Sequence, residues 1–256
     1  MKLPPREDGL RAIKRYAHYP VMRYRSNVYE HSRRVAMIVR ELAPLAHERW
    51  GTGFNKERAV LLALVHDDIE IVTGDYLAGN KALMSTVELQ KIKDEEQSAL
   101  TILAKAYPTK FHNCHYEDLI YEAYQAETTE ALLMKYADKW DGFGEALHEI
   151  FGGNIYFAKP ITTQHGEIEP APLYYINFLG RFREQTTALR DLFAVPHPLL
   201  EAPSRIDFQT IAEYGQAHTR ATLSAASDYA PYDAWKKAVL AFGEPSDIEA
   251  LVMVRE

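Results

Sequence analysis

The sequence predicts an all-α protein that folds as a helix bundle. Along most of the chain, apolar residues recur every three or four positions, which is the spacing of one face of a helix. Strand signals are nearly absent, since the best candidate, residues 154–164, is interrupted by Pro160. Hydrophobic residues make up 47% of the 256-residue chain, enough to bury the core of one large domain or of two small ones.

Six helices are expected before residue 152. Pro20 stops the first, and the side chains of Asn27 and Asn55 are suitable caps for the second and third. Pro44 lies inside the second pattern, where a proline kinks or splits a helix. In chain order, the six helices are predicted over residues 8–19, 27–50, 55–68, 85–107, 116–127 and 128–151.

The remainder of the chain is predicted to be a helical extension. A pair of glycines closes the first set of helices, and a loop with three prolines follows over residues 154–172. A helix over residues 173–193 and two or three shorter ones complete the chain. We therefore divide the chain into a core of residues 1–153 and a C-terminal extension of residues 154–256 that packs on the core.

The composition argues against several functional classes. A net charge of −7 disfavours a general nucleic-acid-binding protein. The single cysteine, Cys114, excludes a disulfide framework and fits a reducing compartment. No apolar signal core begins the chain, and no uncharged apolar run is long enough to span a bilayer. We expect a cytoplasmic protein with no membrane or nucleic-acid partner.

Acidic residues and a histidine gather where the third predicted helix ends. The apolar stretch from residue 61 stops at His66-Asp67-Asp68, and Glu70 and Asp75 follow closely. Adjacent side chains such as His66 and Asp67 can converge on one metal ion only near a helix end, because neighbours within a helix diverge by about 100°. Asp68 is expected to be a solvated surface residue.

Two further residues complete a candidate metal site. His31 lies in the second predicted helix, and Asp138 lies in the sixth among apolar residues that face the core. A buried carboxylate needs a partner, which a metal ion would supply. Each residue alone also fits an ordinary structural role, so the order His, His-Asp, Asp carries the inference.

That order resembles the H…HD…D signature of the HD-domain metal-dependent phosphohydrolases, and more closely their 5'-deoxynucleotidase-like branch. The resemblance covers about residues 15–155. It depends on three segments: "YPVMRYRSNVYEHSRRVAM" at 19–37, "HDDIEIVTGD" at 66–75 with Lys81 beyond it, and "ETTEALLMKYADKWD" at 127–141.

The resemblance implies an HD-domain helix bundle, here with additional C-terminal helices, and a divalent transition metal (Mn, Co, Fe, Ni or Zn). The implied metal ligands are His31, His66, Asp67 and Asp138. Glu70 and Asp75 would then form the acid–base pair at the reacting phosphate, with Arg23, Lys81 and Lys135 as candidate phosphate contacts. Members of this branch are often dimers, and the aromatic residues around Tyr174 would suit a subunit interface.

The expected activity is hydrolysis of nucleoside phosphates, most simply 5'-(deoxy)nucleoside monophosphates to nucleoside and phosphate. This chain has Tyr19 where the branch has a sugar-selecting tryptophan, and His18 where it has an arginine, so Tyr19 is a candidate substrate contact and the sugar preference stays open. The alternatives are a (d)NTP triphosphohydrolase, an alarmone hydrolase and a non-catalytic HD-fold binding protein. Ile71 disfavours the alarmone hydrolases, which have an acid at that position.

Overall fold

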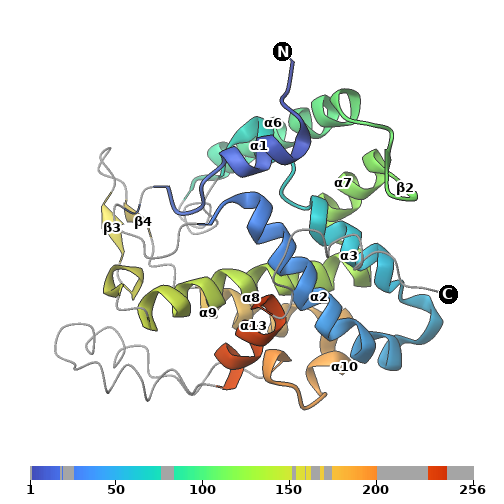
Figure 1. The fold of residues 1–256 in the computed structure, drawn as a ribbon, viewed down its shortest axis with the longest axis vertical. Coiled ribbons are helices and arrows are strands. Elements are labelled where there is room, and N and C mark those ends of the chain that lie inside the picture. Colours follow the sequence, from blue (N-terminus) through green and yellow to red (C-terminus); the bar gives the residue numbers. More distant parts are fainter. Residues whose placement is uncertain are drawn as a thin grey trace.

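The computed structural model describes residues 2–17, 19, 26–75, 84–151, 154–158, 160–162, 168–169, 175–200 and 230–240. Within these residues the protein is almost entirely helical (Figure 1). The longer helices are α1 (Arg6–Ala12), α2 (Val28–Trp50), α3 (Lys56–Val65), α6 (Thr86–Ala106), α7 (Tyr116–Gln125), α8 (Thr129–Phe151), α9 (Tyr175–Gln185) and α13 (Ala230–Leu240). The predicted all-α class is confirmed.

Short elements connect these helices. Two single-turn helices are α4 (Glu70–Thr73) and α10 (Arg190–Phe193), and the 3-10 turns are η1 (Gly51–Gly53), η2 (Ile155–Ala158), η4 (Thr187–Leu189) and η5 (Pro198–Leu200). Two antiparallel pairs of two-residue strands are described: β1 (Lys110–Phe111) with β2 (Cys114–His115), and β3 (Ile161–Thr162) with β4 (Ile168–Glu169). The strand candidate at 154–164 was therefore mostly wrong, because its first part forms η2.

The two caps predicted from the sequence are confirmed. Asn27 accepts a hydrogen bond from the backbone N–H of Glu30, and the Glu30 side chain accepts one from the N–H of Asn27, which completes a capping box. Asn55 accepts from the N–H of Arg58 at the start of α3. Helix α2 is continuous past Pro44, so of the two effects expected of this proline, a kink or a split, the split does not occur.

The first helix is shorter than predicted. It ends at Ala12, because the residues after it pair with the strand-like segment before α2. Lys14 forms a β-bridge with Asn27, and the N–H of Arg15 donates to the carbonyl of Ser26 at 3.2 Å. This pairing places Arg15 beside the start of α2.

One hydrophobic core joins the helices. Helix α3 is buried on nearly all sides and contacts α2, α7 and α8. Trp140 and Phe143 of α8 are fully buried, and the same cluster includes Leu179 of α9 and Trp235 of α13. The division of the chain into two parts at residue 153 stays a prediction. The hydrophobic core contains side chains from both sides of that residue.

Asp68 corrects a prediction. It was expected at the surface, but its side chain is fully buried. It accepts hydrogen bonds from Arg6 Nε at 2.5 Å, Arg6 Nη2 at 2.8 Å and the Tyr116 hydroxyl at 2.7 Å. Asp68 therefore ties α1 and α7 to the end of α3, and the third predicted helix stops at Val65 rather than continuing through Asp68.

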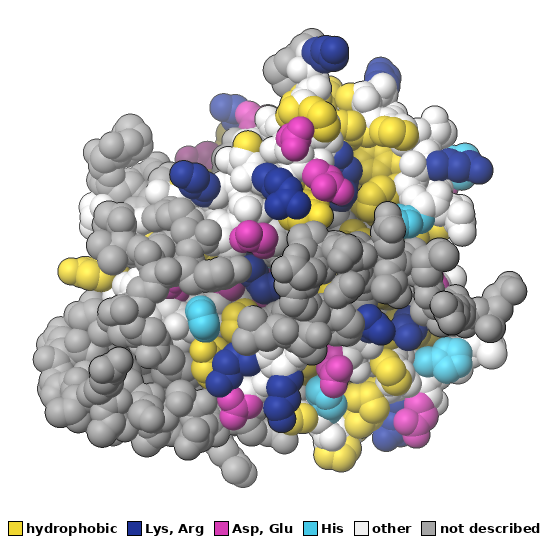
Figure 2. Space-filling model, in the orientation of Figure 1, with side chains coloured by type: hydrophobic (Ala, Val, Ile, Leu, Met, Phe, Trp, Pro, Cys, Tyr) yellow, Lys and Arg dark blue, Asp and Glu magenta, His cyan; other side chains and the backbone are white. Residues whose placement is uncertain are grey.

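The described surface carries both signs of charge. On the face in Figure 2, Lys and Arg side chains are interspersed with Asp and Glu. Within the described segments, no helix is both long and apolar enough to cross a membrane.

Candidate metal centre and active site

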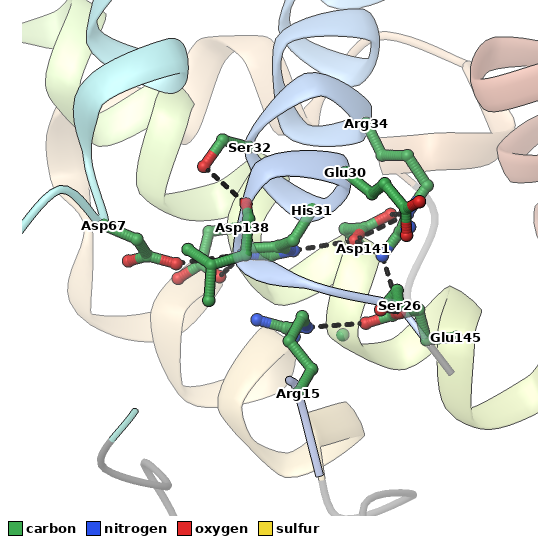
Figure 3. Close-up of polar contacts among 12 residues, drawn as sticks. Arg15, Ser26, Glu30, His31, Ser32, Arg34, Asp67, Asp138, Asp141 and Glu145 are labelled. Carbon is green, nitrogen blue, oxygen red and sulfur yellow. Dashed lines mark hydrogen bonds and ion pairs between the residues drawn. The ribbon is translucent and has the colours of Figure 1, made fainter. Parts of the chain in front are cut away.

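His31 occupies the first turn of α2, whose start is fixed by the capping box, and its side chain is fully buried. Its Nε2 lies 3.4 Å from Asp67 Oδ2 and 3.2 Å from Asp138 Oδ1. Figure 3 shows the imidazole between these two carboxylates on one side and Asp141 on the other. The residues come from α2, the end of α3 and α8, so the fold brings together positions far apart in the sequence.

His66 and Asp67 follow the last residue of α3. The Nδ1–H of His66 donates to the carbonyl of Ala63 at 2.8 Å, which leaves Nε2 with its lone pair. That Nε2 lies 3.2 Å from Asp67 Oδ2, and the rings of His31 and His66 are 5.2 Å apart between centroids. The two side chains thus converge at a helix end.

These donors fit a divalent cation. Nε2 of His31 and Nε2 of His66 are buried and make no hydrogen bond. Ligand atoms of His31, His66 and Asp67 lie within 4.8 Å of one another, and Asp138 lies against the same imidazole. Buried polar atoms without partners are costly, and a cation between these atoms would satisfy all of them. Imidazole and carboxylate donors suit transition metals.

The electrostatics of the ligand set favour a positive charge. Burial opposes ionisation of Asp67, but His66 and His31 hold its pKa well below the usual range. Burial likewise opposes ionisation of Asp138, while Lys139 and His31 lower its pKa. For His31, burial and Arg15 act against protonation, yet the surrounding carboxylates of Asp138, Asp141 and Asp67 raise its pKa to about 10.

Glu70 and Asp75 lie beside the ligand set. Glu70 begins α4, and its Oε2 is buried with no hydrogen-bond partner. Burial raises the pKa of Glu70 well above its ordinary value, and the nearby charges of Asp67 and Asp75 act in the same direction. Burial also raises the pKa of Asp75, although Arg15 opposes that shift. Carboxyl groups with raised pKa values are suited to proton transfer near neutral pH.

A pocket of about 210 Å³ opens next to these acids. Of the predicted site residues, those that line it are His66, Asp67, Glu70, Asp75, Lys135 and Asp138. Tyr19 does not line it: its side chain is 1% exposed, and its ring lies 4.9 Å from that of Phe157. Arg23 and Lys81 lie outside the described residues.

Two cations of the pocket were missed by sequence reasoning. Lys139 pairs with Asp138 at 2.5 Å. Arg15 also lines the pocket, and its Nε donates to Glu145 at 2.9 Å. Arg15 could not be found from local pattern, because it reaches the pocket only through the backbone pairing that ends α1. Lys139 could have been found from the sequence, because it directly follows Asp138.

A second buried carboxylate was also missed. Asp141 accepts a hydrogen bond from His31 Nδ1–H at 2.8 Å. Burial opposes its ionisation, but Arg34 and His31 lower its pKa, so it is ionised. Asp141 lies three residues after Asp138, so the two side chains are neighbours on the surface of α8. This spacing was the signal from which the sequence could have revealed Asp141.

The class of protein known as the HD domain is defined by an all-α bundle of this kind. Adjacent His and Asp donors lie at the end of one helix, and two other helices provide one further His and one further Asp. A family model described as "5'-deoxynucleotidase YfbR-like" matches residues 8–184, and this chain belongs to that family. Similar proteins include 5'-deoxynucleotidase YfbR of Shigella boydii serotype 18 and of Escherichia coli strain K12 / DH10B. Each is 32% identical over 162 residues, which cover 62% of this chain and 80% of the relative.

Proposed function

We propose that this protein is a metal-dependent phosphohydrolase that cleaves 5'-(deoxy)nucleoside monophosphates to nucleoside and phosphate. The observation that carries the proposal is one pocket lined by the proposed metal ligands His66, Asp67 and Asp138, by two carboxyl groups with raised pKa values and by several cations. Membership of the YfbR-like family and the activity in the names of its relatives support the same substrate class.

The metal would be held by His31, His66, Asp67 and Asp138. When bound, it would supply Lewis-acid polarisation and neutralise charge at the phosphoryl oxygens. Two imidazoles with two carboxylates favour a transition ion, and we propose Mn, Co, Fe, Ni or Zn.

The remaining residues would position the substrate and move protons. Arg15, Lys135 and Lys139 line the pocket and provide the positive charge that a dianionic phosphate needs. In the reaction a water oxygen forms a bond to phosphorus while the bond from phosphorus to O5' breaks. Glu70 takes the proton from the water, and Asp75 delivers a proton to the leaving O5'.

A panel of phosphorylated metabolites tests this proposal. Deoxynucleoside and ribonucleoside 5'-monophosphates, deoxynucleoside triphosphates and guanosine tetraphosphate are incubated with the protein, and released phosphate is measured. We expect hydrolysis of the monophosphates, loss of activity with a chelator, and recovery with Mn²⁺ or Co²⁺. Hydrolysis of triphosphates alone, or of none of the panel, would contradict the assignment.

We further propose a cytoplasmic homodimer, organised as a core of residues 1–153 with the extension of residues 154–256 packed on it. Two-fold symmetry is the commonest symmetry among soluble oligomers. Tyr174, around which the aromatic interface group was predicted, lies outside the described residues, and Phe178 of the same group is half-buried on α9. Light scattering at micromolar concentration should give twice the 29.2 kDa chain mass, whereas a monomer mass would contradict this part.

A further inference from the structure

The metal ligand His31 is oriented from behind by a buried polar network. Its Nδ1–H donates to Asp141 at 2.8 Å, which fixes the tautomer and turns Nε2 toward Asp67 and Asp138. Asp141 is itself held by Arg34, whose Nε and Nη2 each donate to it at 2.9 Å. The position of the imidazole therefore depends on what holds Asp141.

The network extends to the pocket. Arg34 also pairs with Glu145 at 2.5 Å, and Glu145 accepts from Arg15 Nε at 2.9 Å and from the Ser26 hydroxyl (Figure 3). Asp141 and Glu145 are almost completely buried. Buried charges of this kind are tolerated only when their partners are all in place, so the network has little freedom to rearrange.

The last partner of Asp141 comes from α13. The indole Nε1–H of Trp235 donates to Asp141 Oδ1 at 3.0 Å, and the Trp235 side chain is 3% exposed. Helix α13 contacts α2 and α8 and lies beside them in Figure 1. Its residues lie beyond the segment 8–184 that the family model matches.

Gly144 makes room for this contact. A Cβ atom at position 144 would lie 2.4 Å from three atoms of the Trp235 indole, closer than real Cβ contacts allow. An alanine would otherwise favour the middle of helix α8 by about 0.5–1 kcal/mol. The glycine thus keeps a notch in α8 through which the indole reaches Asp141.

We infer that α13 is a positioning element of the metal centre, with Trp235 acting through Asp141 on the ligand His31. This inference rests on the proposed metal site, but not on the identity of the substrate. Helix α13, which lies outside the segment that the family model matches, would then strengthen metal binding in this chain in addition to packing on the hydrophobic core.

The test compares Trp235→Phe with Tyr232→Phe. The first variant keeps an aromatic ring and removes the N–H to Asp141. The second is a matched control, because Tyr232 lies on the same helix, its ring stacks on Trp235 with centroids 5.9 Å apart, and its hydroxyl bonds His148 rather than Asp141. Co²⁺ and Mn²⁺ affinities are measured by chelator competition, the Co²⁺ absorption spectrum is recorded, and unfolding is followed by circular dichroism.

Trp235→Phe should weaken Co²⁺ and Mn²⁺ binding on the order of 10-fold and alter the Co²⁺ spectrum, since partners of metal-bound histidines typically contribute 10- to 100-fold. Tyr232→Phe should leave the metal affinities and the Co²⁺ spectrum at parent values, even if it lowers the thermal stability as much as Trp235→Phe does. Gly144→Ala, which excludes the indole from its notch, should reproduce the Trp235→Phe effect on the metal.

Equal metal affinity in the parent, Trp235→Phe and Gly144→Ala proteins would overturn this inference while leaving the proposed function intact. A parent protein that binds neither ion would remove the metal site and both proposals with it. A parent that binds the ions but hydrolyses no nucleoside monophosphate would contradict only the proposed substrate.

Discussion

Replacing Glu70 by glutamine separates proton transfer from metal binding. Glutamine keeps the size of the side chain and removes its ability to accept a proton. Because Glu70 Oε2 is buried without a partner and faces the like charges of Asp67 and Asp75, the neutral amide should not destabilise the fold. Glu70 is not among the four proposed ligands, so bound metal should be retained.

The expected loss is in turnover. A positioned general acid–base group contributes about 10²- to 10⁴-fold, which corresponds to about 3–5 kcal/mol of activation free energy. The assay measures metal content and the single-turnover rate with a deoxynucleoside 5'-monophosphate for Glu70→Gln and for the control Asp67→Asn. Asp67→Asn should lose metal and activity together, because it removes a ligand charge.

Two outcomes would refute this reasoning. If Glu70→Gln turns over at nearly the parent rate, another group accepts the proton, and Asp75 becomes the first candidate. If Glu70→Gln loses its metal as Asp67→Asn does, then Glu70 is a ligand and its role as a proton carrier is wrong.

Two further predictions concern stability. Asp68→Ala should destabilise the protein by about 3–5 kcal/mol in urea unfolding, since it removes the buried carboxylate that pairs with the half-buried Arg6 guanidinium and leaves the Tyr116 hydroxyl buried without its partner. Tyr116→Phe should cost about 1.5–3 kcal/mol. A cost below about 1 kcal/mol for Asp68→Ala would contradict a stabilising ion pair at the buried Asp68. Burial lowers the pKa of His148 below its ordinary value of 6.5. The neutral imidazole should therefore contribute its full stability above about pH 6.5, and this contribution should be lost as the pH falls through the pKa of the folded state. Between roughly pH 7.5 and 5.5, the free energy of unfolding should therefore fall less for His148→Gln than for the parent. Equal losses in the two proteins would contradict the lowered pKa of His148.

The sequence predicted well those features that depend on neighbouring residues. The starts of α2 and α3 follow from Asn27 and Asn55, whose side chains bond backbone groups three positions away. The long helices follow from apolar periodicity. The proposed ligand set was found because two of its members are adjacent and because the family pattern fixes the order of the rest.

Features that depend on distant partners were missed or misjudged. The end of α1 at Ala12 is set by pairing with residues 26–28, and Asp68 is buried only because Arg6 and Tyr116 come to it from other elements. The bond from Trp235 to Asp141 joins residues 94 positions apart, and no local pattern indicates it. Long-range contacts of this kind are set by packing rather than by local preference.

Metal content and hydrolysis measured on one preparation test the central claim most directly. The parent and Asp138→Asn are analysed for bound metal after reconstitution with Mn²⁺ or Co²⁺, and both are assayed with a deoxynucleoside 5'-monophosphate. We predict one ion per chain and metal-dependent release of phosphate for the parent, with both lost in Asp138→Asn. Full activity of the parent in excess chelator, or parent-level metal in Asp138→Asn, would contradict the account.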